Sequence, residues 1–295
     1  MSEVKTWWKE GVIYQIYPRS FYDTNGDGVG DLRGIIEKLD YLASLNVDVI
    51  WLNPIFASPN DDNGYDISDY YRVMDEFGSM EDFNELLGGI HQRGMRLILD
   101  IVPNHTSDEH AWFVESRSTT DNPKRDWYIW RKPNADGSPP TNWRTWFSES
   151  AWKLDEKTGE YYLHLFSTKQ PDLNWEKKEV RHAVYDAMKY WLDKGIDGFR
   201  VDVANLMSKP EVYEDYDASD FNAMVDTYAN GPRIHEFMRE MNQEVLSKYD
   251  MMTVGEGPGI DLSNALDYVG YDRKELHMIY QFGHLNLDFG RGGRL

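Results

Sequence analysis

The segment Asp-Gly-Phe-Arg-Val-Asp at residues 197–202 places a cation two positions before a carboxylate. If this segment is a β-strand, alternation puts Arg200 and Asp202 on one face and Val201 on the other. A neighbouring cation favours the ionised carboxylate, the form that a nucleophile needs at neutral pH. A structural ion pair at a strand end would show the same pattern, and the motif alone does not separate the two.

A second carboxylate, Glu256, ends the apolar segment Thr-Val-Gly-Glu at residues 253–256. An apolar environment raises the pKa of a carboxyl, as a general acid requires, although a lone Glu at this place also fits a helix cap or an exposed charge. If the two segments form adjacent barrel strands, Asp202 and Glu256 would approach to about 5–5.5 Å. That separation is typical of retaining glycosidases.

Two further segments carry polar side chains suited to binding a hydroxylated ligand. Residues 100–105 read Asp-Ile-Val-Pro-Asn-His, and His105 could contact a substrate hydroxyl or satisfy a buried carbonyl. Residues 63–67 read Asn-Gly-Tyr-Asp-Ile, in which Tyr65 offers a stacking face beside the acceptor Asp66. The second segment fits turn chemistry equally well.

The acidic run at residues 23–31, Asp-Thr-Asn-Gly-Asp-Gly-Val-Gly-Asp, spaces oxygen ligands as a calcium loop does, with Gly28 at the sharp turn. An EF-hand would need Glu at loop position twelve, and Gly34 stands there, so this is not an EF-hand. A plain Asn/Asp/Gly turn is the alternative. The candidate ligands are Asp23, Asn25, Asp27, the Val29 carbonyl and Asp31.

Short β-branched runs alternate with longer amphipathic stretches, which is typical of a parallel α/β fold. We expect strands at residues 12–18, 47–54, 96–103, 196–203, 251–257 and 276–282. We expect helices near residues 31–45, 79–93, 179–194, 233–249 and 262–274.

The interval from residue 105 to residue 174 breaks this rhythm, because it is rich in Trp, Pro, Asn, Asp and Ser. A structureless loop of that length is uncommon in a compact domain, so the interval is interpreted as an inserted subdomain. Polar residues follow each expected strand, as at the active end of a (β/α)₈ barrel. A doubly wound sheet would look similar, although a Gly-rich phosphate loop is absent from the sequence. The strand-end residues are Arg19, Asn53, Asn104, His105, Asp202, Glu256 and His284.

The amino-acid composition limits the kinds of molecule that this chain is expected to bind. A formal net charge of −20 and a pI near 4.7 disfavour nucleic acid and anionic lipid, whereas a small neutral oligosaccharide remains compatible. The chain has no cysteine, which excludes disulfides and thiol chemistry. Its first residues contain no apolar targeting segment and no later run approaches membrane-spanning length, so we expect a cytoplasmic protein without a membrane partner. The sequence does not indicate an oligomeric state.

In this order, the segments at 63–67, 100–105, 197–202 and 253–256 resemble the conserved regions of glycoside hydrolase family thirteen, the α-amylase family. The segment Gln-Pro-Asp-Leu-Asn at residues 170–174 resembles the extra region of the oligo-1,6-glucosidase and α-glucosidase subfamily. The opening WWKEGVIYQIYPRSFYD and the later YQFGH are also similar to that subfamily.

The resemblance implies an incomplete (β/α)₈ TIM barrel, with about six strands present and a B subdomain inserted after strand three. The first part of the barrel would be residues 1–104, the B subdomain residues 105–174 and the second part residues 175–295. The strands seven and eight, the third catalytic carboxylate and the C-terminal β-domain of the family have no counterpart in the sequence.

The resemblance also implies roles for individual residues. It makes Asp202 the nucleophile, Glu256 the general acid/base and Arg200 the residue that orients the nucleophile. It implies a structural Ca²⁺, or Mg²⁺, in the loop at residues 23–31, and a preference for α-1,6 bonds through Val203. The non-reducing glucose would be lined by Tyr65, Asp66 and His105, with Phe147 and Gln170 nearby.

Together these observations predict a retaining, exo-acting α-glucosidase that hydrolyses α-1,6 and also α-1,4 bonds of short oligosaccharides. The alternatives are a sucrose isomerase or transglucosidase of the same family, a non-catalytic relative, and an inactive fragment. Gly283 stands where subfamily relatives often carry Glu, which leaves the aglycone side of the site open.

Overall fold

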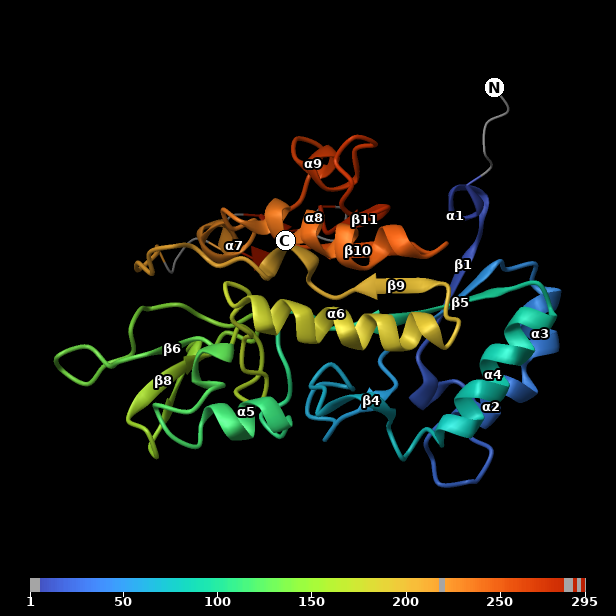
Figure 1. The fold of residues 1–295 in the computed structure, drawn as a ribbon, viewed down its shortest axis with the longest axis horizontal. Coiled ribbons are helices and arrows are strands. Elements are labelled where there is room, and N and C mark those ends of the chain that lie inside the picture. The colour runs from blue at the N-terminus through green and yellow to red at the C-terminus, as the bar shows by residue number, and fades with distance from the viewer. Residues whose placement is uncertain (1–5, 218–220, 284–288, 291–292, 295) are drawn as a thin grey trace.

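The computed structural model describes residues 6–217, 221–283, 289–290 and 293–294, and it is built on one six-stranded parallel sheet (Figure 1). The strand order, β1-β2-β5-β9-β10-β11, follows the chain, and each neighbouring pair is parallel. Every expected strand is present, with bounds a few residues shorter, which confirms the incomplete barrel. The strands are β1 (Ile13–Ile16), β2 (Val49–Leu52), β5 (Arg96–Ile101), β9 (Gly198–Val201), β10 (Met252–Gly257) and β11 (Met278–Gln281).

The two faces of the sheet have different partners. On the inner face, Val49, Ile98 and Met252 form a small apolar cluster against which Trp7 and Trp8 pack. The outward side chains of the same strands join the main core with the helices that cover that face. Because side chains alternate along a strand, this division fixes which residues point into the barrel.

The helices follow the strands in βα order. Helix α4 begins with a capping box, in which the Ser79 side chain accepts from the Asp82 N–H and the Asp82 side chain accepts from the Ser79 N–H. The helices are α1 (Trp7–Glu10), α2 (Leu32–Glu37), α3 (Leu39–Ser44), α4 (Met80–Gln92), α5 (Ala111–Ser116), α6 (Lys178–Asp193), α7 (Phe221–Tyr228), α8 (Ile234–Glu244) and α9 (Ala265–Val269). Short 3₁₀ turns lie at Pro18–Ser20, Arg125–Trp127, Ala204–Leu206 and Leu246–Lys248.

The expected helices differ from the observed ones mainly at their ends. The helix expected at 31–45 is divided at Lys38, which ends α2 and precedes α3. The helix expected at 262–274 shrinks to α9, because the chain turns at Gly270 with extended backbone. Helix α7 was not expected, since the sequence before it carries no clear apolar period.

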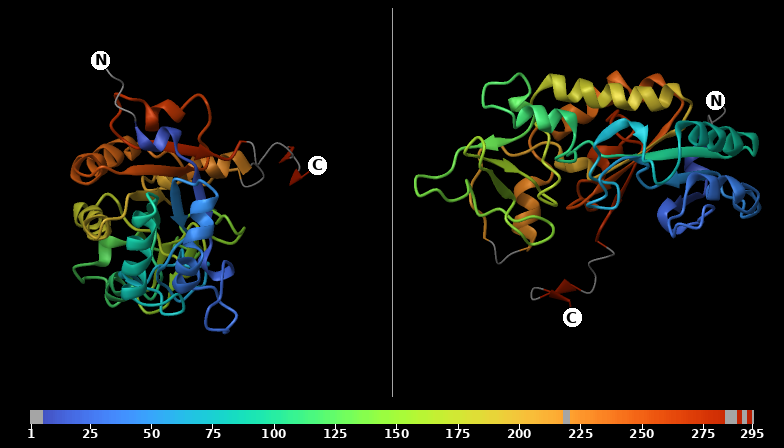
Figure 2. Two further views of the ribbon diagram at one scale, coloured as in Figure 1. Left: turned by 90° about the vertical axis from the view of Figure 1, so that its right-hand side faces the viewer. Right: turned by 90° about the horizontal axis from the view of Figure 1, so that it is seen from below.

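The interval between β5 and α6 forms an antiparallel sheet of its own, in the order β6-β8-β7. It lies beyond the end toward which the β9 arrow points, so it sits at the carboxyl ends of the barrel strands (Figures 1 and 2). A short antiparallel hairpin, formed by β3 and β4, stands in the loop after β2. Its strands and those of the inserted sheet are β3 (Phe56–Ala57), β4 (Asp69–Val73), β6 (Trp130–Arg131), β7 (Trp152–Asp155) and β8 (Glu160–Leu163).

The main sheet is open at both edges. Within the described residues, β1 and β11 each pair with one neighbour, and all four residues of β11 are partly exposed. A two-stranded antiparallel pair, β12 (Phe289–Gly290) and β13 (Gly293–Arg294), follows near the end of the chain. The strand-end residue His284 lies outside the described residues. In the described part of the chain, no helix has both the length and the apolar character needed to cross a bilayer.

Candidate active site

The carboxyl ends of four neighbouring strands bring three carboxylates to one arginine. Asp100 on β5 pairs in register with Arg200 on β9, and Glu256 on β10 pairs with Tyr280 on β11. Asp202 follows β9 on the same face as Arg200, because alternate side chains share a face. The sheet register therefore creates the cluster before any loop contributes to it.

All five N–H donors of the buried Arg200 guanidinium have an acceptor. Nη1 donates to Asp202 and, at 2.7 Å, to Asp100 Oδ1. Nη2 donates to Glu256 Oε2 at 2.6 Å. Nη2 and Nε both donate to the Tyr280 hydroxyl, at 2.7 and 3.0 Å. The two carboxylates that the sequence pairs, Asp202 and Glu256, thus bind the same cation from adjacent strands.

Burial dominates the electrostatics of this cluster. It raises the pKa of Asp202 well above its usual range, and the Arg200 guanidinium acts in the opposite direction. It likewise raises the pKa of Asp100 to about 6. The contact between Arg200 and Asp202 that the sequence predicted is present, and the guanidinium favours the ionised carboxylate that a nucleophile needs.

Glu256 is held by a second donor, the backbone N–H of Val203, at 3.1 Å from Oε2. Val203 has a φ of +33°, in the left-handed region that β-branched residues rarely enter. Such strain is characteristic of functional sites, and here it occurs at the residue whose N–H binds Glu256. Because Oε2 already accepts from Arg200 and Val203, Oε1 is the Glu256 oxygen best placed to carry a transferable proton.

His105 and Gln170 meet at the base of the inserted segment. The Gln170 amide accepts from the Ser167 N–H through Oε1 and donates to Asp62 from Nε2, which fixes its orientation. Its Nε2 then lies 3.2 Å from His105 Nε2. Burial lowers the pKa of His105 to about 4, so the imidazole is neutral at pH 7.

A buried ammonium group joins this region to the loop after β9. Lys209 Nζ lies 2.7 Å from Asp172 Oδ2 and donates to Asn104 Oδ1 at 2.8 Å. Asp172 also pairs with His105 in an isolated antiparallel bridge. The segment at 170–174 is therefore tied to the barrel through both backbone and charge.

The structure separates two residues that the sequence placed together. The Tyr65 ring centroid lies 5.5 Å from the Arg200 guanidinium carbon, and its hydroxyl accepts from Asn53 at 3.1 Å. Asp66 is buried, and its two oxygens accept the backbone N–H groups of Asp61 and Asp62. Tyr65 thus borders the carboxylate cluster, whereas both carboxylate oxygens of Asp66 bind backbone N–H groups of its own loop.

Phe147 belongs to the inserted segment and is 54% exposed. Its ring is 6.2 Å from that of Phe166, whose ring is 5.0 Å from His105. An aromatic path therefore runs from the exposed Phe147 toward His105, without direct contact between the two.

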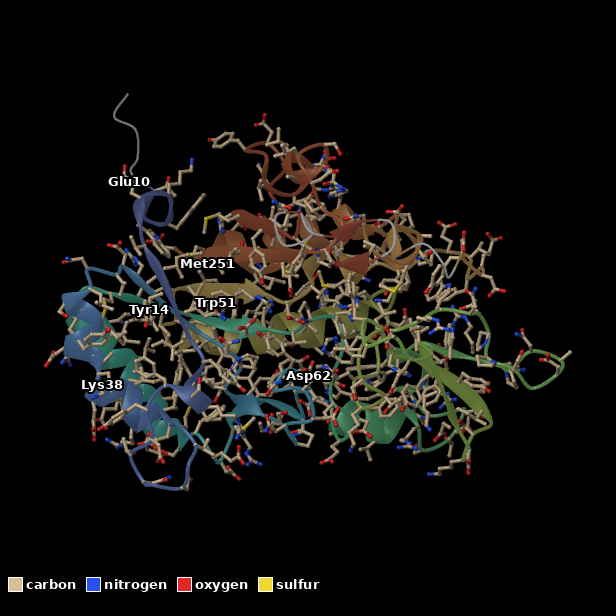
Figure 3. The ribbon with its side chains drawn as sticks, turned by 180° about the vertical axis from the view of Figure 1, so that it is seen from behind. Glu10, Tyr14, Lys38, Trp51, Asp62 and Met251 are labelled. Carbon is tan, nitrogen blue, oxygen red and sulfur yellow. The ribbon has the colours of Figure 1, made fainter. Side chains whose placement is uncertain are left out.

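Some residues of the cluster were not assigned a role from the sequence. Asp100 stood within the motif at 100–105, but nothing distinguished it from a core acid. Trp51, on the strand beside that of Tyr14 (Figure 3), donates to Asp100 Oδ2 at 2.8 Å. Tyr280 stands opposite Glu256 in the register of β10 with β11, and no motif of the sequence shows that register.

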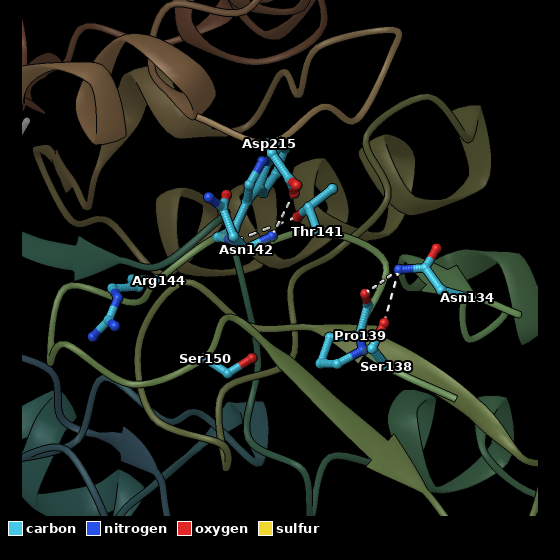
Figure 4. A pocket seen from close by; sticks show the side chains of 9 residues that line it. Asn134, Ser138, Pro139, Thr141, Asn142, Arg144, Ser150 and Asp215 are labelled. Carbon is cyan, nitrogen blue, oxygen red and sulfur yellow. Dashed lines mark hydrogen bonds between the residues drawn. The ribbon is translucent and has the colours of Figure 1, made fainter. Parts of the chain in front are cut away.

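The pocket in Figure 4 lies between the inserted segment and Asp215, in the loop before α7, and apart from the carboxylate cluster. It has a volume of about 480 Å³ and none of the three carboxylates around Arg200 lines it. Its wall includes a hydrogen bond from the Asn142 N–H to Asp215 at 2.8 Å and bonds from Asn134 to its own loop. The chemistry is therefore located by the carboxylate cluster and not by this cavity.

The loop at residues 23–31 uses its side-chain oxygens to shape itself. Asp23 accepts N–H bonds from its own loop, including one from Gly28 at 2.9 Å, and these bonds lower its pKa. Asp31 caps α2 by accepting from the Gly34 N–H at 2.7 Å. Among the described residues, no group of three or more His, Cys, Asp or Glu is arranged to hold a metal ion. The donor set still consists of oxygens, which suits a hard cation.

With this geometry defined, comparisons with known proteins place the chain. Residues 15–294 match the model of the α-amylase catalytic domain. The chain belongs to the α-amylase family. It is 60% identical to an oligo-1,6-glucosidase of Parageobacillus thermoglucosidasius over 98% of this chain and 52% of that protein. It is 54% identical to a trehalose-6-phosphate hydrolase of Bacillus subtilis over 99% of this chain and 51% of that protein.

Solved structures of the α-amylase family superpose closely on the fold. The crystal structure of trehalose-6-phosphate hydrolase from Bacillus licheniformis has a TM-score of 0.92 at 52% identity, covering 97% of this chain and 51% of that one. The isomaltulose synthase from Protaminobacter rubrum has a TM-score of 0.93 at 48% identity, covering 96% and 50%. The chain thus spans about half the length of the relatives that it matches.

Proposed function

We propose that the protein containing this chain is a retaining, exo-acting α-glucosidase that hydrolyses α-1,6, and also α-1,4, glucosidic bonds of short oligosaccharides. The observation that carries the proposal is the placement of Asp202 and Glu256 on adjacent strands, bound to one guanidinium. Retaining glycosidases need two such carboxyl groups on either side of the scissile bond. The similarity to oligo-1,6-glucosidases supports the choice of substrate class.

In the first step, Glu256 protonates the glycosidic oxygen from Oε1 while Asp202 attacks the anomeric carbon. The bond to the leaving group breaks as the bond between glucose and Asp202 forms. In the second step, Glu256 removes a proton from water, which attacks the anomeric carbon and releases Asp202. Arg200 stays bound to both carboxyl groups. Because its guanidinium is planar and rigid, it fixes the orientation of the nucleophile relative to the acid/base.

The remaining site residues are assigned to the non-reducing glucose. Tyr65 supplies a ring beside Arg200, and the neutral His105 with Gln170 supplies a polar surface. Phe147, which is exposed in the inserted segment, would border the entrance. Asp66 would bind a glucose hydroxyl with lone pairs left after it accepts its two loop N–H groups.

We assign a structural Ca²⁺, or Mg²⁺, to the loop at residues 23–31. Carboxylate and amide oxygens that accept one N–H keep a lone pair for a cation, which supports this assignment. The ion would be held by Asp23, Asn25, Asp27, the Val29 carbonyl and Asp31, and it would brace the loop without taking part in bond cleavage. A chelator should then lower the melting temperature, and added Ca²⁺ should restore it. If neither the chelator nor added Ca²⁺ changed the melting temperature, the loop at residues 23–31 would be a turn without a bound metal.

A sucrose isomerase or transglucosidase is the second candidate, because the isomaltulose synthase structure superposes as closely as the hydrolase structure does. Such an enzyme would share the glucosyl-enzyme step and differ in the acceptor. For the hydrolase we also propose a cytoplasmic location, which suits a protein without cysteine.

The proposal is tested in an extended form of the protein, defined as residues 1–295 joined to the part of the Parageobacillus relative that this chain does not cover. Proton NMR of the hydrolysis of a chromogenic α-glucoside, whose leaving group is not a sugar, should show α-glucose before its mutarotation to β-glucose. Initial release of β-glucose would contradict the retaining mechanism. Conversion of sucrose to an isomer without net hydrolysis would favour the second candidate.

A further inference from the structure

Tyr280 stands at the edge of the sheet, yet its hydroxyl reaches the centre of the carboxylate cluster. It accepts from Arg200 Nη2 at 2.7 Å and from Nε at 3.0 Å. The other three donors of the guanidinium go to carboxylates, one each to Asp100, Asp202 and Glu256. Tyr280 is therefore the neutral acceptor in a set whose other members are acids.

The ring of Tyr280 is itself held in place. Its strand pairs in register with β10, so the residue lies directly opposite Glu256. Its ring packs edge-on against Phe282, with centroids 6.0 Å apart. The Arg200 guanidinium carbon lies 5.5 Å from the Tyr65 ring, 5.6 Å from the Trp51 ring and 5.8 Å from the Tyr280 ring. Arg200 is thus enclosed by three rings, one of which also supplies an acceptor.

We propose that Tyr280 is a positioning residue for glucosyl transfer, because its hydroxyl fixes the plane of the Arg200 guanidinium that holds Asp202 and Glu256 at once. The proposal rests on the function proposed above for these two carboxylates. Tyr280 does not touch the reacting atoms, and it acts through Arg200 alone.

The physical reason is the distribution of donors around the guanidinium. Arg200 is only 4% exposed, so a donor without an acceptor is costly. Without the Tyr280 hydroxyl, the Nε–H and one of the two Nη2–H groups would lose their acceptor. The guanidinium would then turn so that these donors reach the neighbouring carboxylates. A neutral oxygen avoids this without adding charge, since burial raises the pKa of Tyr280 and keeps the hydroxyl protonated.

Turning the guanidinium would move both carboxylates that it holds. Asp202 binds through Nη1 and Glu256 through Nη2, so the two groups cannot both keep their positions. A misplacement of about 1 Å at reacting groups can cost about 10²-fold in rate. Substrate binding through Tyr65, His105 and Gln170 would be little affected, because none of them is bonded to Tyr280.

The experiment compares Tyr280→Phe with wild type in the extended form. Tyr14→Phe is the matched control, because Tyr14 lies on the opposite edge strand, β1, and packs against the main core on the outer face of the sheet. Active-site titration gives kcat for each correctly folded site. We expect kcat and kcat/KM for isomaltose to fall together by about 10- to 100-fold in Tyr280→Phe, with KM within about twofold of wild type. Tyr14→Phe should match wild type.

A second readout needs no substrate. The Nε–H signal of Arg200 in a ¹H–¹⁵N spectrum, identified by its loss in Arg200→Lys, should shift and exchange faster with water in Tyr280→Phe. It should be unchanged in Tyr14→Phe. An unchanged signal, or a Tyr280→Phe protein with wild-type kcat, would overturn the proposal.

The two proposals can fail separately. If wild type hydrolyses isomaltose and Tyr280→Phe raises KM without lowering kcat, the hydroxyl aids binding, and its positioning role is wrong while the function stands. If wild type forms no glucosyl-enzyme, the proposed function is wrong, and a positioning role in glucosyl transfer falls with it. In that case the shifted Nε–H signal would report only a structural hydrogen bond.

Discussion

Arg200 connects acceptors that come from four consecutive strands of the main sheet, so small changes at single residues should have separable effects. Asp100 and Tyr280 complete the set of acceptors around it, while Asp202 and Glu256 are the groups assigned to chemistry. The motifs at 197–202 and 253–256 predicted the pairing of the two acids. They could not predict the Tyr280 contact, because that depends on the register of β10 with β11.

Val203 follows the nucleophile and should influence which linkage is cleaved. Its side chain is buried, and Thr has nearly the same shape, so Val203→Thr should preserve the backbone that directs its N–H to Glu256. We expect isomaltose to be preferred over maltose, and Val203→Thr to shift the ratio of kcat/KM toward maltose by about 1–3 kcal/mol. A ratio that does not move in the extended form would remove Val203 from the specificity determinants.

His110 should make stability depend on pH. Burial lowers its pKa to about 4, from 6.5 for an exposed imidazole, and its Nδ1 accepts the Trp112 N–H at the start of α5. The unfolded chain binds more protons than the folded chain between these values. The free energy of unfolding that depends on neutral His110 is therefore fully present above pH 6.5. Up to about 3 kcal/mol of it is lost as the pH falls to 4.

Replacing His110 with Asn keeps a capping side chain but removes the titration. The free energy of urea unfolding, measured from pH 7 to pH 4.5, should fall less steeply in His110→Asn than in the parent. His182→Asn, at an exposed position, is the control and should retain the parent's slope. Equal slopes in all three proteins would show that His110 does not titrate in this range.

At the scale of elements, β9 depends on one glycine. Gly198 has a φ of +149°, and a Cβ there would lie 2.0 Å from the Met252 carbonyl oxygen of the neighbouring strand. Gly198→Ala should therefore separate β9 from β10 and destabilise the fold by about 3 kcal/mol or more. Gly94→Ala is the matched control, because its φ of +74° is strained but its Cβ would meet nothing within 4 Å. It should cost only about 1–2 kcal/mol in thermal unfolding. Similar losses in the two variants would contradict the close approach.

The elements themselves show where sequence patterns suffice. Alternating and apolar runs located all six strands of the main sheet, because each is a short buried segment bounded by turns. They did not locate α7, nor the break at Lys38, because both depend on tertiary packing. Gly34 shows such packing close by, since a Cβ there would lie 2.0 Å from the Tyr22 carbonyl oxygen in the loop that leads into α2.

At the scale of the molecule, the open sheet should limit what these 295 residues do alone. Within the described residues, β1 and β11 present unpaired edges, and such edges favour association between chains. We expect the 295-residue chain, expressed alone, to be poorly soluble or partly unfolded and to have no meaningful turnover of a chromogenic α-glucoside. Size-exclusion chromatography, urea unfolding and the assay would compare it with the extended form. A monomeric chain that unfolds cooperatively with comparable turnover would contradict this expectation.

The central claim is that Asp202 forms a covalent bond with glucose while Glu256 serves as acid and base. An activated 5-fluoro-α-glucosyl fluoride should trap that intermediate in the extended form, because the fluorine slows release of the sugar more than its transfer. Peptide mapping by mass spectrometry should then find one fluoroglucosyl group, on the peptide that contains Asp202, and none in Asp202→Ala. A label on Glu256, on Asp100 or on any other carboxylate would contradict the account.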